Sequence, residues 1–135
     1  MITTYFKNCI TGNVFHCPDP TPLPTSYYLA LSTSTPAVDG TGVREPSVGA
    51  GYCRIPLPDL GSPVNGVLTN ESEIKFRIST GGWGSISHFL VYDSEEVGSG
   101  NLLLFERLDP AVRVDDRSAL VIPEGKLKLE TTGIS

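Results

Sequence analysis

Short apolar runs separated by turn-forming residues are the feature that most restricts the fold of this chain. Residues 73–79 alternate, which directs Ile74, Phe76 and Ile78 toward a core and Lys75 and Arg77 toward solvent. Gly, Pro, Asn and Asp gather between the runs, where they favour turns. The pattern predicts an all-β fold, a single β-sandwich or jelly-roll-like domain of about 7–8 short antiparallel strands. Strands are expected at residues 27–32, 50–57, 73–79, 86–92 and 101–107, with shorter runs at 112–114, 120–122 and 127–129.

The apolar content of residues 86–92 predicts a strand at the centre of the sheet. Simple alternation would place Ile86, His88 and Leu90 on one face of this strand and Phe89 and Val91 on the other. His88 is therefore expected to be a buried, hydrogen-bonded histidine.

Proline and glycine residues predict the position of one sheet edge and of one tight turn. Pro56 and Pro58 restrict the end of the run at residues 50–57 to a sheet edge, because proline has no amide donor. Asn65-Gly66 is the strongest short turn signal in the chain, since both residues readily adopt positive φ.

The N-terminal residues have the spacing of a short helix. Apolar side chains stand at Ile2, Phe6, Cys9 and Ile10, which predicts a helix over residues 2–10 that Gly12 ends. So short a helix is not stable alone in water and must pack either on the chain's own β-sandwich or on a neighbouring subunit. Assembly contacts with a partner are accordingly expected at four residues, Ile2, Tyr5, Phe6 and Ile10.

A proline-rich segment separates this helix from the first strand. Four prolines between residues 17 and 24 fix φ and remove amide donors, so the segment is predicted to be an extended linker. The chain of 135 residues is long enough for one domain. We therefore expect an attachment arm at residues 1–25 and a β-sandwich domain at residues 26–135.

Charge and composition exclude several functions. The formal charge is 10 minus 15, or −5, without the basic patch of a nucleic-acid binder. No apolar run approaches the roughly 20 residues of a membrane span, so membrane insertion is not expected. The N-terminus is not a secretory signal, which favours synthesis and retention in a cytoplasm. An odd number of irregularly spaced cysteines predicts three unbridged thiols, Cys9, Cys17 and Cys53.

The residues that could carry chemistry do not form a recognisable catalytic or metal-binding pattern. The chain has two histidines, and no Gly-x-Ser-x-Gly motif surrounds a serine nucleophile. Cys9, His16 and Cys17 lack the paired spacing of a structural zinc site. Neither acidic pair, at residues 95–96 or 115–116, has the alternating ligands of a calcium loop. We expect no enzyme activity, no metal and no cofactor.

A possible recognition surface is formed by the glycine- and proline-rich loop at residues 36–49 together with Trp83. Its candidate contacts are Asp39, Thr41, Arg44 and Trp83. Trp83 has two interpretations, because a tryptophan between glycines can stack on a sugar or can close one end of a β-sandwich. The packing interpretation is the one that we favour.

Five segments, taken in order, resemble a family of small bacteriophage virion proteins that are often labelled tail fibre proteins. The family pattern reads Y-L-x-L-S-T, D-G-x-G-V-x-E-P, G-x-Y-x-R, W-G-x-I-x-H-F-x-x-Y-D and G-x-L-L. The corresponding segments here begin at Tyr28, Asp39, Gly51, Trp83 and Gly100. The resemblance runs from residue 2 to about residue 129. The dense proline linker and residues 95–100 depart from the pattern, and both affect loops.

This resemblance implies a non-catalytic structural protein of the virion, made in the cytoplasm of the host bacterium. It implies several copies on the particle exterior, either as a tail fibre or tail-associated protein or as a capsid decoration or head fibre. Other virion proteins, in the capsid or the tail, and further copies of the chain would be its partners. An alternative is a receptor-binding module for host cell-surface carbohydrate. A third, a small glycan-active enzyme, would require two acids about 5–10 Å apart across a groove.

Overall fold

The computed structural model describes residues 1–58 and 60–130. Within them the chain forms one α-helix, one 3₁₀ turn and eight strands, and every strand pairing is antiparallel. This is a small all-β domain with a short N-terminal helix, as the sequence predicts. The elements are α1 (Thr4–Val14), β1 (Tyr28–Ser32), η1 (Val48–Ala50), β2 (Ile55–Pro56), β3 (Val67–Thr69), β4 (Ile74–Lys75), β5 (Gly84–Tyr92), β6 (Leu102–Val114), β7 (Val121–Ile122) and β8 (Lys128–Glu130).

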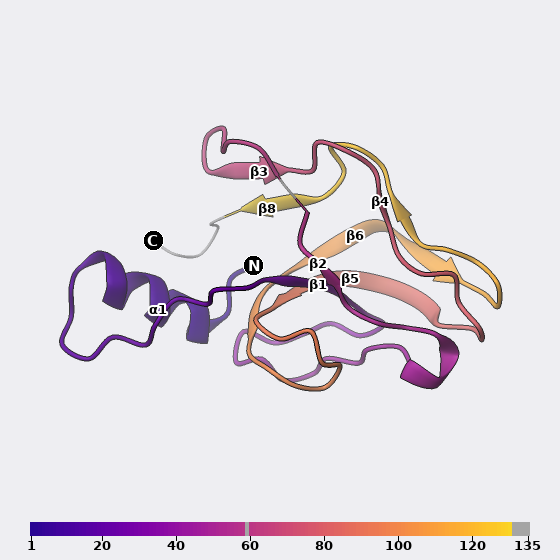
Figure 1. The fold of residues 1–135 in the computed structure, drawn as a ribbon, viewed down its shortest axis with the longest axis horizontal. Coiled ribbons are helices and arrows are strands. Elements are labelled where there is room, and N and C mark those ends of the chain that lie inside the picture. Colours follow the sequence, from indigo (N-terminus) through magenta and orange to yellow (C-terminus); the bar gives the residue numbers. More distant parts are fainter. Residues whose placement is uncertain (59, 131–135) are drawn as a thin grey trace.

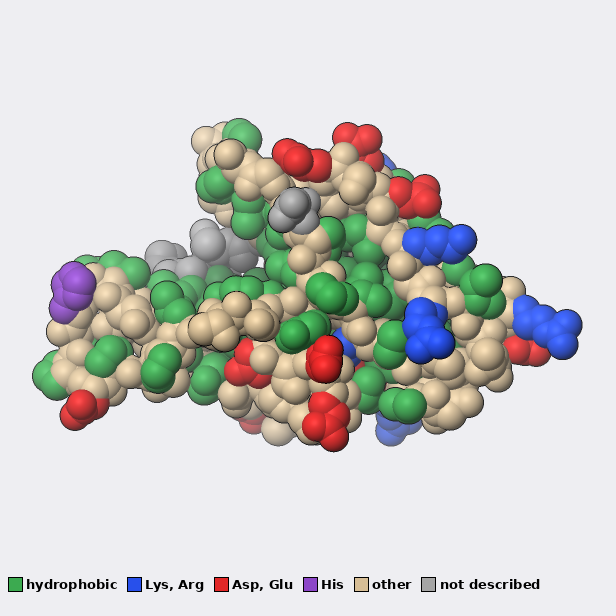
Figure 2. Space-filling model, viewed as in Figure 1, with side chains coloured by type: hydrophobic (Ala, Val, Ile, Leu, Met, Phe, Trp, Pro, Cys, Tyr) green, Lys and Arg blue, Asp and Glu red, His purple; other side chains and the backbone are tan. Residues whose placement is uncertain are grey.

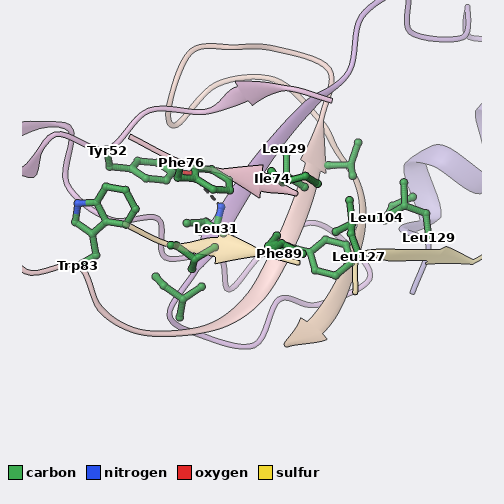
Figure 3. Close-up of a cluster of buried hydrophobic side chains, with 14 of the residues drawn as sticks. Leu29, Leu31, Tyr52, Ile74, Phe76, Trp83, Phe89, Leu104, Leu127 and Leu129 are labelled. Carbon is green, nitrogen blue, oxygen red and sulfur yellow. Dashed lines mark hydrogen bonds between the residues drawn. The ribbon is translucent and has the colours of Figure 1, made fainter. Parts of the chain in front are cut away.

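A four-stranded sheet in the order β2-β1-β5-β6 forms the centre of the molecule. Two ribbons, β3–β8 and β4–β7, lie over one face of this sheet (Figure 1). The main core fills the space between sheet and ribbons. Trp83 and Tyr52 lie at one end of this core, and Leu104 and Leu129 lie at the other (Figure 3). A smaller cluster occupies the opposite face of the sheet and consists of Ala30, Leu90, Tyr92, Leu102 and Phe105.

The predicted central strand is central, but its two faces differ from simple alternation. A register shift between Ile86 and His88 marks a bulge in the pairing of β5 with β6. Because of this shift, Ile86 joins Phe89 and Val91 in the main core. The prediction that Ile86 shares a face with His88 and Leu90 is therefore wrong.

The prediction that Ile78 is a core residue is wrong, because the side chain of the next residue, Ser79, points inward. Ile74 and Phe76 are buried as expected, whereas Ile78 is 58% exposed. Ser79 points inward instead, and its hydroxyl oxygen accepts a hydrogen bond from the Ser118 amide at 3.0 Å. Regular strand structure covers only Ile74–Lys75, so the expected alternation does not extend to residue 78.

Two predicted strands have different lengths in the structure. The run at residues 50–57 shortens to Ile55–Pro56, because Val48–Ala50 form a 3₁₀ turn and Gly51 follows with φ 83°. The expected edge position of Pro56 is confirmed. The runs at 101–107 and 112–114 instead join as one strand, β6. Ile86 pairs with Val112 and His88 with Arg107, so Pro110 lies in the unpaired segment between these pairs, where it interrupts no ladder.

The Asn65-Gly66 turn forms as predicted. Both residues have positive φ, 53° and 78°. Val64 and Val67 on either side exchange two backbone hydrogen bonds, of 2.9 and 3.0 Å. The turn brings the chain back into β3, which pairs with β8 along the upper edge of the molecule in Figure 1.

The N-terminal helix is real but displaced along the chain. It begins at Thr4, with the Thr3 hydroxyl accepting a hydrogen bond from the Phe6 amide, and it continues through Gly12 to Val14. Gly12 does not end the helix. The returning chain passes beside it, and a Cβ built there would lie at an ordinary contact distance of 3.4 Å from Cβ of Pro20. In Figure 1 the helix and this returning segment project together from the body.

Candidate functional site

The base of the N-terminal arm is attached to the outer edge of β6. The Thr3 amide donates to the Leu103 carbonyl at 3.0 Å, and the Phe105 amide donates to the Met1 carbonyl at 2.9 Å. Ile2 is thereby paired opposite Leu104 and lies buried, outside the helix in which the sequence placed it. The N-terminal amine completes the attachment through contacts with the Glu106 carboxylate and the Phe105 carbonyl. The arm therefore begins from a fixed position.

An apolar groove of about 530 Å³ opens between the arm and the β3–β8 ribbon. We call it the arm groove. Its lining comes from the arm, from the central sheet and from the chain around β3 and β8. No charged residue occurs among the described residues that line it. They are Ile2, Phe6, Ile10, Tyr27, Leu57, Leu60, Pro63, Gly66, Leu68, Val91, Leu104 and Leu129.

The helix carries its apolar face beyond the arm groove. Phe6 and Ile10 line the groove, and Val14 follows at the same four-residue spacing on the same face. Val14 is 59% exposed, and its neighbour Phe15 is 72% exposed. We call this pair the arm tip. Figure 2 shows apolar side chains along the projecting arm.

Three of the four predicted assembly residues meet in the arm groove: Ile2, Phe6 and Ile10. The fourth, Tyr5, is half-buried, packs against the main core and does not line the groove. The opposite wall, with Leu60 and Leu68 as examples, was not anticipated. Sequence spacing within the helix identifies one wall, but no local signal indicates which distant segment faces it.

The candidate recognition residues do not form one surface. Asp39, Thr41 and Arg44 are exposed on the loop at residues 36–49. The Asp39 carboxylate accepts hydrogen bonds from the Thr41 amide at 3.0 Å and the Thr41 hydroxyl at 2.6 Å, and these bonds lower the pKa of Asp39. The turn at residues 39–41 of this loop is thus fixed by its own side chains.

Trp83 lies in the core, with 4% of its surface exposed. Its indole N–H donates to the Ala50 carbonyl at 2.9 Å. Its ring meets the Tyr52 ring edge to face, with centroids 5.4 Å apart (Figure 3). These contacts agree with the packing interpretation of this residue.

A buried ion pair beneath the loop is the feature that the sequence interpretation missed. The Arg54 guanidinium donates to both carboxylate oxygens of Glu45, at 2.6 and 3.1 Å. The Tyr52 hydroxyl donates to Glu45 at 2.7 Å and accepts from the Leu31 amide at 2.9 Å. Burial, followed by the charge of Glu45, raises the pKa of Tyr52. The Arg54 guanidinium also lies 3.7 Å above the Tyr92 ring centroid.

Arg54 connects this ion pair to a second loop. Its guanidinium donates to the Ser94 and Ser99 carbonyls at 2.7 and 2.8 Å, which fixes the connection between β5 and β6. Glu45, Tyr52, Arg54 and Tyr92 come from three of the five segments that carry the family resemblance. These residues lie in separate segments of the sequence and come together only in the fold, so no single segment indicates their contacts.

A second hollow, of about 540 Å³, lies between these two loops. We call it the loop hollow. Polar and apolar groups both contribute to it, among them Val43, Arg44, Glu45, Tyr92 and Val97. Of the predicted recognition residues, only Arg44 reaches this hollow.

The residues with catalytic or ligating chemistry are dispersed. His88 is buried, with Nδ1 2.8 Å from the Ser87 hydroxyl oxygen, and burial together with Arg107 lowers its pKa. Cys9 is buried, Cys53 half-buried and Cys17 exposed. Among the described residues no three His, Cys, Asp or Glu side chains gather closely enough to hold a metal ion. In the same residues no helix has the length and apolar character needed to cross a membrane.

Comparison with known families identifies the family of this chain. A family model described as "Podophage GP4 fiber I protein gp80" matches residues 1–130. The matched region includes the arm, both loops and the strands β1 to β8. No curated protein matches the chain.

Proposed function

The chain belongs to the family of the podophage GP4 fiber I protein gp80, and from this membership we propose that it is a non-catalytic structural component present in several copies on the virion exterior. Residues 1–25 would act as an attachment arm, and residues 26–135 would form the β-sandwich body. Its partners would be other virion proteins and further copies of itself. Within the virion, a tail fibre position or a capsid decoration or head fibre position would suit such a component.

The observation that carries this proposal is the arm groove. Soluble monomers rarely expose large continuous apolar surfaces, and such surfaces usually mark sites of protein association. Here Phe6 and Ile10 face a groove with no charged side chain among its described lining residues. The exposed arm tip extends the same apolar surface. A partner that covers both would remove them from water.

The hydrogen bonds that hold Glu45 and Arg54 beside the loop hollow also support a structural role. Glu45 is held by Arg54 and Tyr52, and Arg54 is held by two backbone carbonyls as well. A carboxylate with so many fixed partners is poorly placed to exchange protons with a substrate. Its contacts instead fix two loops against the sheet.

Virion incorporation tests this function. Phage particles would be produced with the wild-type chain or with Ile10→Ser, purified by density gradient, and analysed for the chain by quantitative mass spectrometry. We expect several copies per particle for the wild type and a large loss for Ile10→Ser. Val48→Ser changes an exposed residue of η1 outside the groove and is the control. Melting of the purified variants separates lost assembly from lost folding. Absence of the wild-type chain from purified particles would contradict the proposal.

A second candidate function is recognition of host cell-surface carbohydrate through the loop hollow. It is favoured by a fixed hollow that combines Arg44 with the apolar side chains of Val43 and Val97. A glycan array tests it with the wild-type chain and Arg44→Ala. Binding that depends on Arg44 would support recognition, whereas an array without hits would leave only the structural role.

A further inference from the structure

The two-residue turn that leads into β3 holds the only Asn-Gly pair in the sequence, Asn65-Gly66. We propose that Asn65 is a site of spontaneous deamidation, and that the isoaspartate formed there opens this turn. The reaction needs only water and converts a neutral residue into an acidic one. It concerns the chemical lifetime of the folded chain, and it therefore goes beyond the proposed function in the virion.

The reacting groups lie at the surface of the molecule. Asn65 and Gly66 are both exposed, and the preceding residue, Val64, is 69% exposed. Water therefore reaches the side-chain amide of Asn65. Because Gly66 has no Cβ, no side chain obstructs the approach of its amide nitrogen to the side chain of Asn65.

The other asparagines lack this combination of features, because none of them precedes a glycine. Asn70 is 2% exposed, and its side-chain amide donates to the Ser72 carbonyl at 2.8 Å. Asn101 is exposed, as Asn65 is, but its side-chain amide donates to the Asp93 carboxylate at 3.0 Å. Leucine follows Asn101 in the sequence. Asn70 and Asn101 therefore serve as internal comparisons for Asn65.

The turn can open without unfolding of the body. Two backbone hydrogen bonds between Val64 and Val67, of 2.9 and 3.0 Å, close it. The strand that follows, β3, has three residues and pairs with β8 in a two-stranded ribbon. An isolated two-stranded ribbon is only marginally stable, so local opening at its end has a low free-energy cost. Opening lets the backbone between Asn65 and Gly66 rotate into the geometry that ring closure requires.

The chemistry consists of two balanced steps. The Gly66 amide nitrogen attacks the side-chain carbonyl carbon of Asn65, a carbon–nitrogen bond forms, and the bond to the side-chain nitrogen breaks. That nitrogen takes the Gly66 amide proton and leaves as ammonia, and a five-membered succinimide remains. Water then adds to one of the two ring carbonyls, which gives either aspartate or isoaspartate. Neither step needs an oxidant, a reductant or a metal ion.

Isoaspartate is incompatible with the turn as it stands. It carries the main chain through the former side chain and so lengthens the backbone by one carbon atom. The turn has two residues, with φ of 53° and 78°, and its length fixes the pairing of Val64 with Val67. The longer backbone cannot keep both hydrogen bonds of this pair. Because Gly66 and Leu68 line the arm groove, the loss also loosens one wall of that groove.

Peptide mapping of the ageing protein tests the site. The purified chain would be kept at pH 9 and 37 °C, where loss of the Gly66 amide proton favours attack, and then digested with trypsin at pH 6. Cleavage after Arg54 and Lys75 places Asn65 and Asn70 in one peptide. We expect a mass increase of about one dalton, with isoaspartate fragments, to arise at Asn65 at least tenfold faster than at Asn70 or Asn101. Equal rates at the three positions, or no conversion at Asn65, would overturn the proposal.

Two variants separate the reaction from its effect on the turn. Asn65→Gly keeps a residue that adopts positive φ but has no side chain to react, so its peptide should keep its mass at pH 9. Asn65→Asp has the charge of the deamidated chain on a normal backbone. The isoaspartate form, isolated by chromatography, should therefore melt at a lower temperature than Asn65→Asp. Equal melting temperatures would show that the turn survives and would overturn the proposed opening. Both measurements use the purified chain, so their outcome is independent of its entry into virions.

Discussion

Removing the charge of Glu45 is expected to destabilise the protein strongly. Glu45→Gln has nearly the same shape but leaves the Arg54 guanidinium, whose side chain is 0% exposed, without its counter-charge. It also places an amide group where the guanidinium and the Tyr52 hydroxyl both donate. Breaking a buried ion pair on one side costs about 3–5 kcal/mol. For a chain of this size that loss lowers Tm by roughly 10–20 °C.

The control is the same acid-to-amide change at a solvated pair. Arg113 and Asp115 form an ion pair of 2.9 Å, with side chains 75% and 67% exposed. Asp115→Asn should therefore cost only about 0–1 kcal/mol. Urea denaturation at pH 7 measures both variants through the shift of the midpoint at constant slope.

A double variant tests the explanation itself. Glu45→Gln/Arg54→Met removes both charges, so its cost should be clearly smaller than the sum of the two single variants. If Glu45→Gln costs less than about 1 kcal/mol, or if the two changes are additive, the pair is solvated and does not fix the loops.

Three further predictions follow from burial and charge. Phe76→Ala should cost about 3–5 kcal/mol in urea denaturation because Phe76 is buried, whereas Ile78→Ala at an exposed position should cost less than about 1 kcal/mol. Similar costs for the two variants would show that Ile78, and not Ser79, points into the core. Trp83→Ala should lower Tm by roughly 10 °C or more without changing any carbohydrate binding, and unchanged stability would contradict the packing role. Because the pKa of His88 is lowered in the folded state, the unfolded state binds more protons, and the contribution of neutral His88 to stability is present above about pH 6.5 and is lost as the pH falls through the folded-state pKa. The urea midpoints at pH 7.5 and 5.5 should therefore differ less in His88→Gln than in the wild type, and an unchanged difference would assign the pH dependence to other groups.

The parts of the fold that depend on neighbouring residues could be predicted from the sequence. The Asn65-Gly66 turn and the central position of residues 86–92 required only local turn chemistry and apolar content. The errors occur where pairing between distant segments overrides the local pattern. A bulge moves Ile86 to the other face of β5, and the inward Ser79 leaves Ile78 exposed. Neither change has a signal within its own segment.

The candidate site was predictable to a similar extent. The helical spacing of Phe6 and Ile10 identified one wall of the arm groove, although Ile2 reaches it from an extended segment rather than from the helix. Leu60 and Leu68 could not be assigned to the facing wall, because only the tertiary fold brings them there. The partnership of Glu45 and Arg54 was hidden for the same reason.

We propose that this chain is a virion component whose arm groove is covered by a neighbouring subunit. A cryo-electron microscopy reconstruction of the virion at side-chain resolution tests it most directly. We expect several copies on the particle exterior, with density from another chain against Phe6 and Ile10 in each groove. Copies whose grooves open to solvent, or particles without the chain, would contradict the account.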